Sequence, residues 1–156
     1  GNQIIYLDHI SDPGNLGTII RTAVWFGVDQ IILSENCVSV WNPKVLRSGM
    51  GAHFKIQMIV QNLSEVVIET TKDGHQIIGA TMDGIQLEQV NPELKKWILI
   101  LGNEANGLTP EIKQLLHQKI TINGSGNQES LNVAVAGSIV LYDRGINKPR
   151  FIRSGK

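Results

Sequence analysis

The chain has 156 residues, of which 42% are hydrophobic, and its formal net charge is zero. This length suits one domain with a substantial core. No apolar run approaches the ~18–20 residues that a membrane-spanning helix needs, which excludes that class of membrane protein. Cys37 is the only cysteine, which excludes an internal disulfide and a cysteine-based zinc site and fits a reducing cytoplasm.

The charge is distributed unevenly along the chain. No acid follows Asp143, and the basic residues beyond it are Arg144, Lys148, Arg150, Arg153 and Lys156. The rest of the chain carries an excess of acid and offers little non-specific attraction to phosphates. We therefore divide the chain into a domain at 1–144 and a basic tail at 145–156. The four histidines are far apart and lack a metal-ligand spacing, so we expect no metal.

Strand-like and helix-like segments alternate through the first half of the chain. The apolar residues between Leu16 and Ala23 recur at helical spacing, and Asn15 is placed to cap that helix. The expected elements are a strand at Ile4–Leu7, a helix from Asn15 to about Phe26, a strand at Gln30–Leu33, a short helix at Pro43–Arg47 and a strand at Lys55–Val60.

The second half continues the alternation, which predicts an α/β domain with a mostly parallel sheet. The final helix has unusually small side chains, so a neighbouring element should pack very close to it. The expected elements are a helix capped by Ser64 and running to about Thr71, a strand at Gln76–Thr81, a loop at Met82–Pro92, a strand at Ile98–Leu101, a helix from Pro110 to about His117, a strand at Lys119–Ile122 and a helix at Ser130–Asp143.

The stretch Ile98–Leu108 is the most informative single segment. Its four leading apolar residues, without alternation, are typical of a strand that is covered on both faces. The polar turn from Gly102 that follows stands where open α/β sheets place their ligands. The alternative is an ordinary connection to the next helix with Glu104 solvated, and this stretch alone does not separate the two.

Common cofactor and catalytic motifs do not fit the chain. Gly124-Ser125-Gly126 resembles the start of a dinucleotide fingerprint, but Glu129 replaces the third glycine and the segment does not follow the first strand. The only glycine–lysine pair is at the C-terminus, and no Gly-x-Ser-x-Gly elbow is present.

Three ordered segments together resemble the SpoU, or TrmH-like, RNA ribose 2′-O-methyltransferases of the SPOUT superfamily. Asn15–Ala23 is similar to the first family motif, Leu101–Leu108 to the second, and the stretch from Ile122 through Ser130–Ala136 to the third. Val45–Ala52 resembles the connecting segment of the family. The resemblance covers essentially all of residues 3–143.

The resemblance implies a sheet with helices on both faces and a C-terminal deep trefoil knot, one of the rare exceptions to unknotted connectivity. Asn123 departs from the family, which usually has proline there, and the loop Asn123–Glu129 is unusually polar. The family commonly carries an N-terminal RNA-binding domain. This chain starts at the first strand of the catalytic domain, so we expect that domain to be absent from it.

S-adenosylmethionine is the cofactor that the resemblance implies, held in the knot mainly by backbone groups. The family contacts fall on Gly102, Ile122 and Leu131. Ordinary turn chemistry is the alternative role for the glycines of these loops.

The family assigns the central catalytic part to the arginine of the first motif, here Arg21. A guanidinium is a poor base, so holding a phosphate and stabilising the developing alkoxide is the more cautious role. Glu104 and Asn132 would orient Arg21 or the ribose, and Asn15 and Ser130 would shape the pocket. By spacing alone Arg21 is a surface residue stacked along Trp25. Asn132 could likewise simply satisfy backbone groups at a helix start.

The resemblance therefore predicts an enzyme that transfers a methyl group from S-adenosylmethionine to a ribose 2′-hydroxyl of ribosomal or transfer RNA. We expect a cytoplasmic homodimer with RNA as its partner and with no membrane or DNA partner. Two alternatives remain: a knotted homologue that binds RNA without methylating it, and an adenosine-cofactor enzyme that acts on a small molecule.

Overall fold

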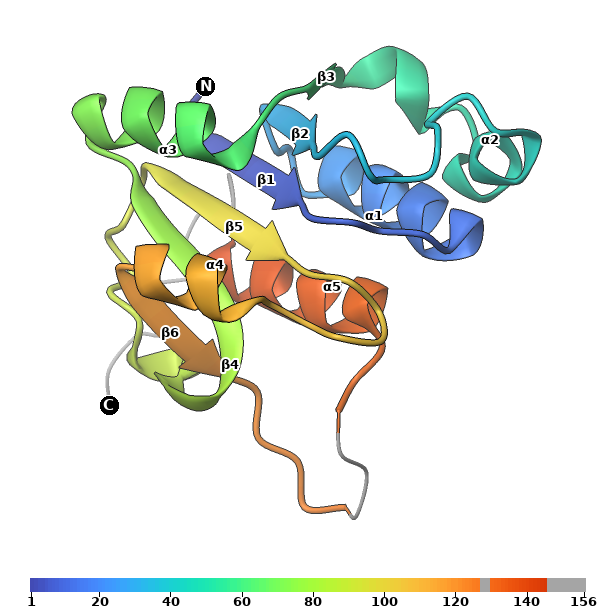
Figure 1. Cartoon of the computed structure of the whole chain (residues 1–156). Coiled ribbons are helices and arrows are strands. Elements are labelled where there is room, and N and C mark those ends of the chain that lie inside the picture. The colour runs from blue at the N-terminus through green and yellow to red at the C-terminus, as the bar shows by residue number, and fades with distance from the viewer. Residues whose placement is uncertain (127–129, 146–156) are drawn as a thin grey trace, which may run out of the picture.

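The computed structural model describes residues 1–126 and 130–145, which form one six-stranded sheet between layers of helices (Figure 1). The sheet order is β3-β2-β1-β5-β4-β6, and every strand pair is parallel. The strands are β1 Gln3–Leu7, β2 Gln30–Leu33, β3 Gln57–Val60, β4 Gln76–Gln86, β5 Trp97–Leu101 and β6 Gln118–Thr121. The α-helices are α1 Pro13–Trp25, α2 Pro43–Gly49, α3 Leu63–Lys72, α4 Pro110–Leu115 and α5 Val133–Arg144, and the 3-10 helices are η1 Ala52–Lys55 and η2 Leu87–Gln89.

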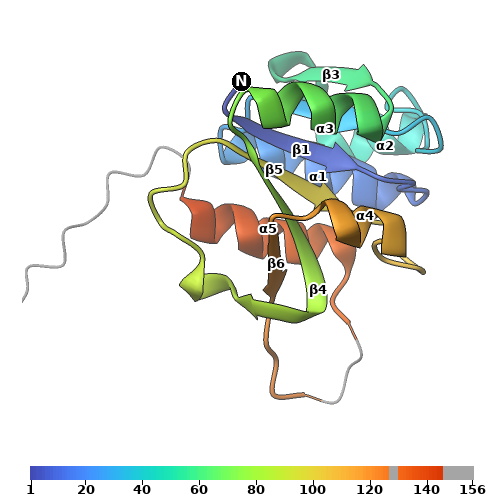
Figure 2. The same ribbon diagram turned by 60° about the vertical axis from the view of Figure 1, so that its left-hand side comes forward.

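Helices cover both faces of the sheet, as the sequence predicts (Figure 2). Ile5 and Leu7 of β1 point to the face covered by α1 and α5, where they join one buried cluster. Ile4 and Tyr6 point to the opposite face and join a second cluster with residues of α3 and α4. Residues of one strand therefore contribute alternately to two hydrophobic cores, because successive side chains of a strand point to opposite faces.

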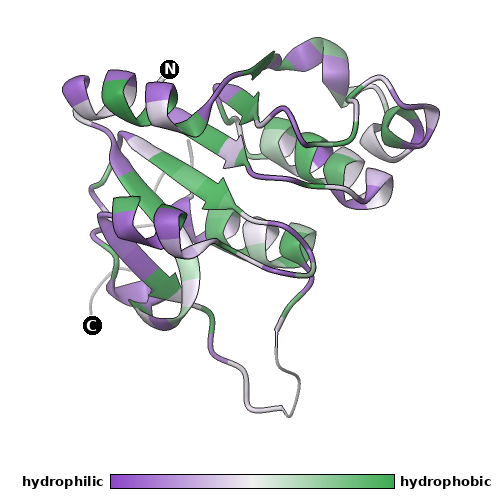
Figure 3. Cartoon of the chain, viewed as in Figure 1, coloured by the Kyte–Doolittle hydropathy of each residue, from purple (hydrophilic) through white to green (hydrophobic). Residues whose placement is uncertain are grey.

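The central strands β1 and β5 lie side by side and carry the predicted site at their ends. All five residues of β5 are buried, and Figure 3 shows these two strands as a largely apolar band. The backbone N–H of Asp8, just past β1, donates to the carbonyl of Leu101 at 2.9 Å. The carboxyl ends of both strands thus meet at one edge of the sheet, where ligands of parallel sheets bind.

Two predicted helix caps are wrong. Asp12, not Asn15, caps α1: its side chain accepts from the Asn15 N–H at 3.0 Å, and Pro13 occupies the first turn. Asn62, not Ser64, caps α3 in the same way. In both cases an Asx residue further upstream reaches the free N–H groups of the first turn, so each helix starts two or more residues earlier than predicted.

Several predicted boundaries also shift. The segment Met82–Pro92 is not a loop throughout, because β4 continues to Gln86 and η2 follows. A register shift between Ala80 and Ile85 lets β4 pair with β6 a second time. Elsewhere the predicted Lys55–Val60 strand begins at Gln57 after η1, α4 ends at Leu115 rather than His117, β6 runs Gln118–Thr121 rather than Lys119–Ile122, and α5 begins at Val133 rather than Ser130.

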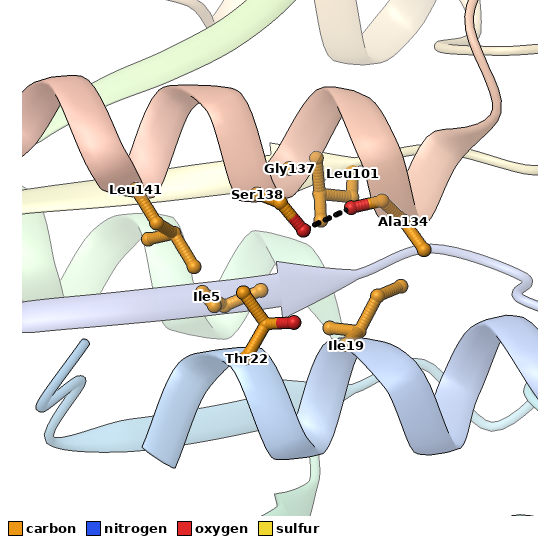
Figure 4. Close-up of a pocket in the computed structure, with 8 residues that line it drawn as sticks. All are labelled: Ile5, Ile19, Thr22, Leu101, Ala134, Gly137, Ser138 and Leu141. Carbon is orange, nitrogen blue, oxygen red and sulfur yellow. Dashed lines mark hydrogen bonds between the residues drawn. The ribbon is translucent and has the colours of Figure 1, made fainter. Parts of the chain in front are cut away.

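The small residues of α5 let it pack closely against the sheet, as predicted. A Cβ at Gly137 would lie 2.9 Å from Cδ1 of Leu101. Figure 4 shows this region between α1 and α5, with the Ser138 hydroxyl donating to the Ala134 carbonyl at 2.7 Å. The space between the two helices holds no water-sized cavity, so it is a packing contact and not a ligand site. Among the described residues, no helix is long and apolar enough to cross a membrane.

Candidate active site at the carboxyl edge of the sheet

Glu104 ties together two of the loops at the carboxyl edge of the sheet. Its Oε1 accepts from the backbone N–H of Ser11 at 2.9 Å and of Asp12 at 3.1 Å. Its Oε2 accepts from the Ser11 hydroxyl at 3.0 Å. Glu104 follows β5 and its partners follow β1, so the carboxylate joins segments more than ninety residues apart in the chain. The carboxylate is thus committed to backbone donors rather than left solvated.

These donors set the charge state of Glu104. Partial burial opposes ionisation, but the hydrogen bonds from the N–H of Asp12, from its own N–H and from Ser11 outweigh it and lower the pKa of Glu104 below its ordinary value of 4.5. A carboxylate held by several N–H groups favours its charged form. Glu104 is therefore an anion at neutral pH, and its charge helps hold the loop after β5 to the loop after β1.

Asn103 shapes the same loop from within. Its Nδ2 donates to the His9 carbonyl at 2.8 Å, and its Oδ1 accepts from the N–H groups of Ala105 and Asn106 at 2.9 and 3.1 Å. A Cβ at Gly102 would lie 2.5 Å from the backbone carbonyl of Gly107. The loop folds tightly back on itself, and only glycine at 102 permits that approach.

Asn15 and Asn132 meet across the starts of α1 and α5. Asn132 Nδ2 donates to Asn15 Oδ1 at 2.9 Å. Asn132 Oδ1 accepts from the N–H groups of Ala134 and Val135 at 2.9 and 3.2 Å, so Asn132 is also the N-cap of α5. The cap role that the sequence left as an alternative is present, and the same side chain still reaches a residue 117 positions away.

Arg21 lies further along α1 and is exposed. Its Nη1 lies 3.1 Å from Sδ of Met50, the C-cap of α2. The carboxylate of Glu104 is engaged with Ser11 and Asp12, so the predicted orienting contact between Glu104 and Arg21 is absent from the described contacts. Arg21 is held on the surface by a neutral thioether, which leaves its charge available to an anionic ligand.

Two of the predicted cofactor contacts, Ile122 and Leu131, lie on the segment between β6 and α5. Ile122 is partly buried and packs against the core, and Leu131 is 49% exposed. No atom lies within 4 Å of a Cβ built at Gly124 or Gly126. Ser130 is exposed on the same segment. Residues 127–129 of the predicted loop Asn123–Glu129 and residues 146–156 of the basic tail lie outside the described residues.

Two titratable groups near the end of β1 escaped the sequence analysis. Burial raises the pKa of Asp8, and nearby His9 opposes that rise in part. Burial, with Asp8 and Cys37 nearby, raises the pKa of Tyr6 to about 12. The Tyr6 hydroxyl therefore stays protonated at neutral pH, and it donates to the Gln61 carbonyl at 3.1 Å.

Sequence reasoning also missed Ser11, Asp12 and Asn103 as structural partners of the site. The Asp12-Pro13 pair was a usable signal, since an acid before proline is a frequent helix start. Nothing in the sequence pairs Ser11 with Glu104. Within residues 1–126 and 130–145, no group of three His, Cys, Asp or Glu side chains could hold a metal ion.

The SpoU rRNA Methylase family model matches residues 2–142. The chain belongs to this family. Members of the SpoU family with similar sequences include the 23S rRNA (guanosine(2553)-2′-O)-methyltransferase RlmP of Bacillus subtilis, which is 35% identical over 140 residues, or 90% of this chain and 56% of that protein. The resemblance inferred from the three motifs is thereby confirmed.

Solved structures of SpoU-type proteins share the fold. A putative RNA methyltransferase of the TrmH family from Porphyromonas gingivalis has a TM-score of 0.84 at 35% identity, over 92% of this chain and 59% of that one. An AdoMet-bound rRNA methyltransferase from Sinorhizobium meliloti has a TM-score of 0.87 at 31% identity, over 92% and 56% of the two chains. The chain thus spans little more than half the length of these relatives.

Proposed function

We propose that residues 1–144 form the catalytic domain of an enzyme that transfers a methyl group from S-adenosylmethionine to a ribose 2′-hydroxyl of ribosomal or transfer RNA. The observation that carries this proposal is the Asn15–Asn132 hydrogen bond. It joins the first and third family motifs beside the second, which Glu104 ties to the β1–α1 loop. Membership of the SpoU family and the 2′-O-methyltransferase relative support the same reaction.

Gly102, Ile122 and Leu131 are the residues that we assign to the cofactor. Space is open around Gly124, and Leu131 is half exposed, so this segment is accessible to a ligand. When bound, S-adenosylmethionine supplies a methyl group already activated by its sulfonium leaving group. The tight turn at Gly102 fixes where the loop presents its backbone groups.

The side chains of the site then align and activate the ribose. Arg21 holds an RNA phosphate and stabilises the negative charge that develops on the 2′-oxygen, since its exposed guanidinium contacts only a neutral sulfur among its described hydrogen bonds. Asn132 orients the ribose, and Asn15 and Ser130 shape the pocket. Glu104 acts indirectly, because its hydrogen bonds keep the loop between β1 and α1 in place.

We further propose that the segment from β6 through α5 threads a loop of the chain and forms the trefoil knot implied by the family. The starts of α1 and α5 are held together by the Asn15–Asn132 pair, and Gly137 brings α5 against Leu101. A knot would hold these segments side by side through the path of the backbone, without a covalent cross-link.

A homodimer is the second part of the proposal. Four apolar residues lie along one side of α5 and its approach, at spacings of three to four residues: Leu131, Val135, Ile139 and Tyr142 are 49%, 47%, 37% and 64% exposed. Trp25, at the end of neighbouring α1, is 83% exposed, and Phe26 packs edge-on to Tyr142 with ring centroids 6.4 Å apart. Such an apolar face is typical of subunit interfaces.

With ribosomal or transfer RNA as substrate, we place the enzyme in the cytoplasm.

The test is methyl transfer from tritiated S-adenosylmethionine to purified ribosomal RNA, transfer RNA and DNA, followed by digestion to nucleosides. We expect label in 2′-O-methylated nucleosides of RNA and none in DNA, with Arg21→Ala as the matched inactive control. A folded protein that binds the cofactor and labels no RNA would instead be the non-methylating, RNA-binding homologue. Label in a small molecule would indicate the third class of function.

A further inference from the structure

A groove of about 410 Å³ lies outside the site described above, at the ends of β2 and β3. The loop 34–41 forms one wall, and Met58 and Val60 of β3 line the other. Strand β3 is at the edge of the sheet, so one side of its backbone has no neighbouring strand among the described residues. The groove therefore combines apolar side chains with backbone hydrogen-bonding groups.

Trp41 lines this groove and lies close to two other aromatic rings. Its indole lies 5.8 Å from the His53 ring and 6.5 Å from the Phe54 ring, and 59% of the residue is exposed. His53 is buried, and its Nε2 donates to the Val40 carbonyl at 2.7 Å. The indole thus lies beside the buried His53 and the exposed Phe54, and contact with the buried ring restricts its rotamers, which lowers the entropy lost when a ligand stacks on it.

The groove is connected directly to the candidate active site. The N–H of Val38 donates to the Ile10 carbonyl at 2.9 Å, and the N–H of His9 donates to the Ser34 hydroxyl at 2.9 Å. The carbonyl of His9 accepts from Asn103 on its other side. The segment that follows β1 is therefore shared: the groove loop binds one side of it and the loop after β5 binds the other.

Cations occur close to Trp41 in the chain. Glu35 lines it, but no acid occurs between Glu35 and Glu65. Lys44 lies three residues after Trp41, and Lys55 directly follows Phe54, whose ring is near that of Trp41. Both lysines and Arg47 are exposed. An exposed aromatic ring with cations close to it in the chain is a combination by which proteins bind single-stranded nucleic acid, with bases stacked on the ring and phosphates near the positive charges.

We propose that this groove binds an unpaired nucleotide of the RNA substrate, close to the nucleotide that is methylated, with its base stacked on Trp41. The proposal rests on the RNA-directed function above and deepens it by naming a contact for the substrate strand. The nearby Lys44 and Lys55 set this face apart from the apolar side of α5 (Leu131, Val135, Ile139 and Tyr142), which suits a second copy of the chain.

The experiment measures binding of a short fluorescein-labelled single-stranded RNA of mixed sequence, and of the same RNA annealed to its complement, by anisotropy at low salt. Trp41→Ala should weaken binding of the single strand about tenfold or more, because loss of one stacking platform has effects of that size. Trp41→Phe should stay within about threefold of the parent. Met82→Ala removes a side chain that is 85% exposed on β4 and serves as the matched control.

A second readout does not depend on how well Trp41→Ala folds. In a Trp25→Phe protein the remaining indoles are Trp41 and the buried Trp97, so quenching of tryptophan emission by the unlabelled single strand reports stacking on Trp41. Quenching together with a tenfold loss of affinity in Trp41→Ala supports the groove even if methyl transfer is never detected, which separates this proposal from the function itself.

Three results would overturn the groove assignment. They are no RNA binding by the parent chain, binding of Trp41→Ala within twofold of the parent with unquenched emission, and a dimer that becomes monomeric in Trp41→Ala. The last result would show that the face contacts a second copy. Methyl transfer to RNA by a protein with any of these results would leave the proposed function in place and remove only the nucleotide contact.

Discussion

Replacing Glu104 with Gln tests whether its charge braces the site. The carboxylate accepts from the N–H groups of Ser11 and Asp12 and from the Ser11 hydroxyl. Hydrogen bonds to a charged acceptor contribute ~1.5–3 kcal/mol against ~0.5–1.5 for neutral pairs. Since Glu104 is only partly buried, we expect Glu104→Gln to lower the free energy of unfolding by about 1–2 kcal/mol at neutral pH, and Glu104→Ala by about 2–3.

The pH dependence makes this prediction sharper. The pKa of Glu104 is lowered in the folded protein from 4.5, so its contribution is fully present above that value and is lost as the pH falls through the lower folded-state pKa. Urea unfolding of the parent and Glu104→Gln, followed by circular dichroism from neutral to acid pH, should give a difference that shrinks toward zero in acid. Glu88→Gln, at an exposed acid on η2, should show no difference at any pH. A Glu104→Gln difference that is absent at neutral pH, or equally large in acid, would refute the charged brace.

Three further predictions concern the catalytic, loop and interface residues. Arg21→Lys keeps the charge but loses the planar guanidinium, so Arg21→Lys and Arg21→Ala should both lower single-turnover methyl transfer about 10²–10³-fold and keep cofactor affinity. Transfer within a few-fold of the parent would return Arg21 to a surface role. Gly102→Ala places a Cβ 2.5 Å from the backbone of its own loop and should lower the free energy of unfolding by about 1–3 kcal/mol, measured by thermal unfolding. Gly124→Ala, with open space around it, should change it by less than about 0.5 kcal/mol. Equal effects would contradict the close approach. Ile139→Asp should convert a dimer to a monomer in light scattering, while Ile68→Asp on α3 should not; a dimer that survives Ile139→Asp places the interface elsewhere.

The close approach at Gly102 gives this residue a structural role in its own loop, beside its proposed cofactor role. Its lack of a side chain was expected to allow close approach of the cofactor, with ordinary turn chemistry as the alternative. The structure places the carbonyl of Gly107 where a Cβ would be, so a larger residue would deform the loop whether or not a ligand is present. Effects of a Gly102 substitution on cofactor binding are therefore inseparable from its effects on the loop.

Local patterns in the sequence determined the class of fold and most of its elements. The unbroken apolar run Ile98–Leu101 marks β5, because a strand buried on both faces cannot alternate. The small residues of α5 predicted its close packing, realised by Gly137 against Leu101. The ordered motifs, which place Asn15, Glu104 and Asn132 at loop and helix starts, were sufficient to identify the family.

Tertiary structure alone decided what these side chains touch. Glu104 binds Ser11 and Asp12, more than ninety residues away. Trp41 lines a groove and lies beside the rings of His53 and Phe54. Helix and strand patterns report which face of an element is buried, over windows of a few residues. The partner of a polar side chain depends instead on how the loops at the end of the sheet converge, which is set by strand order and by every packed layer at once.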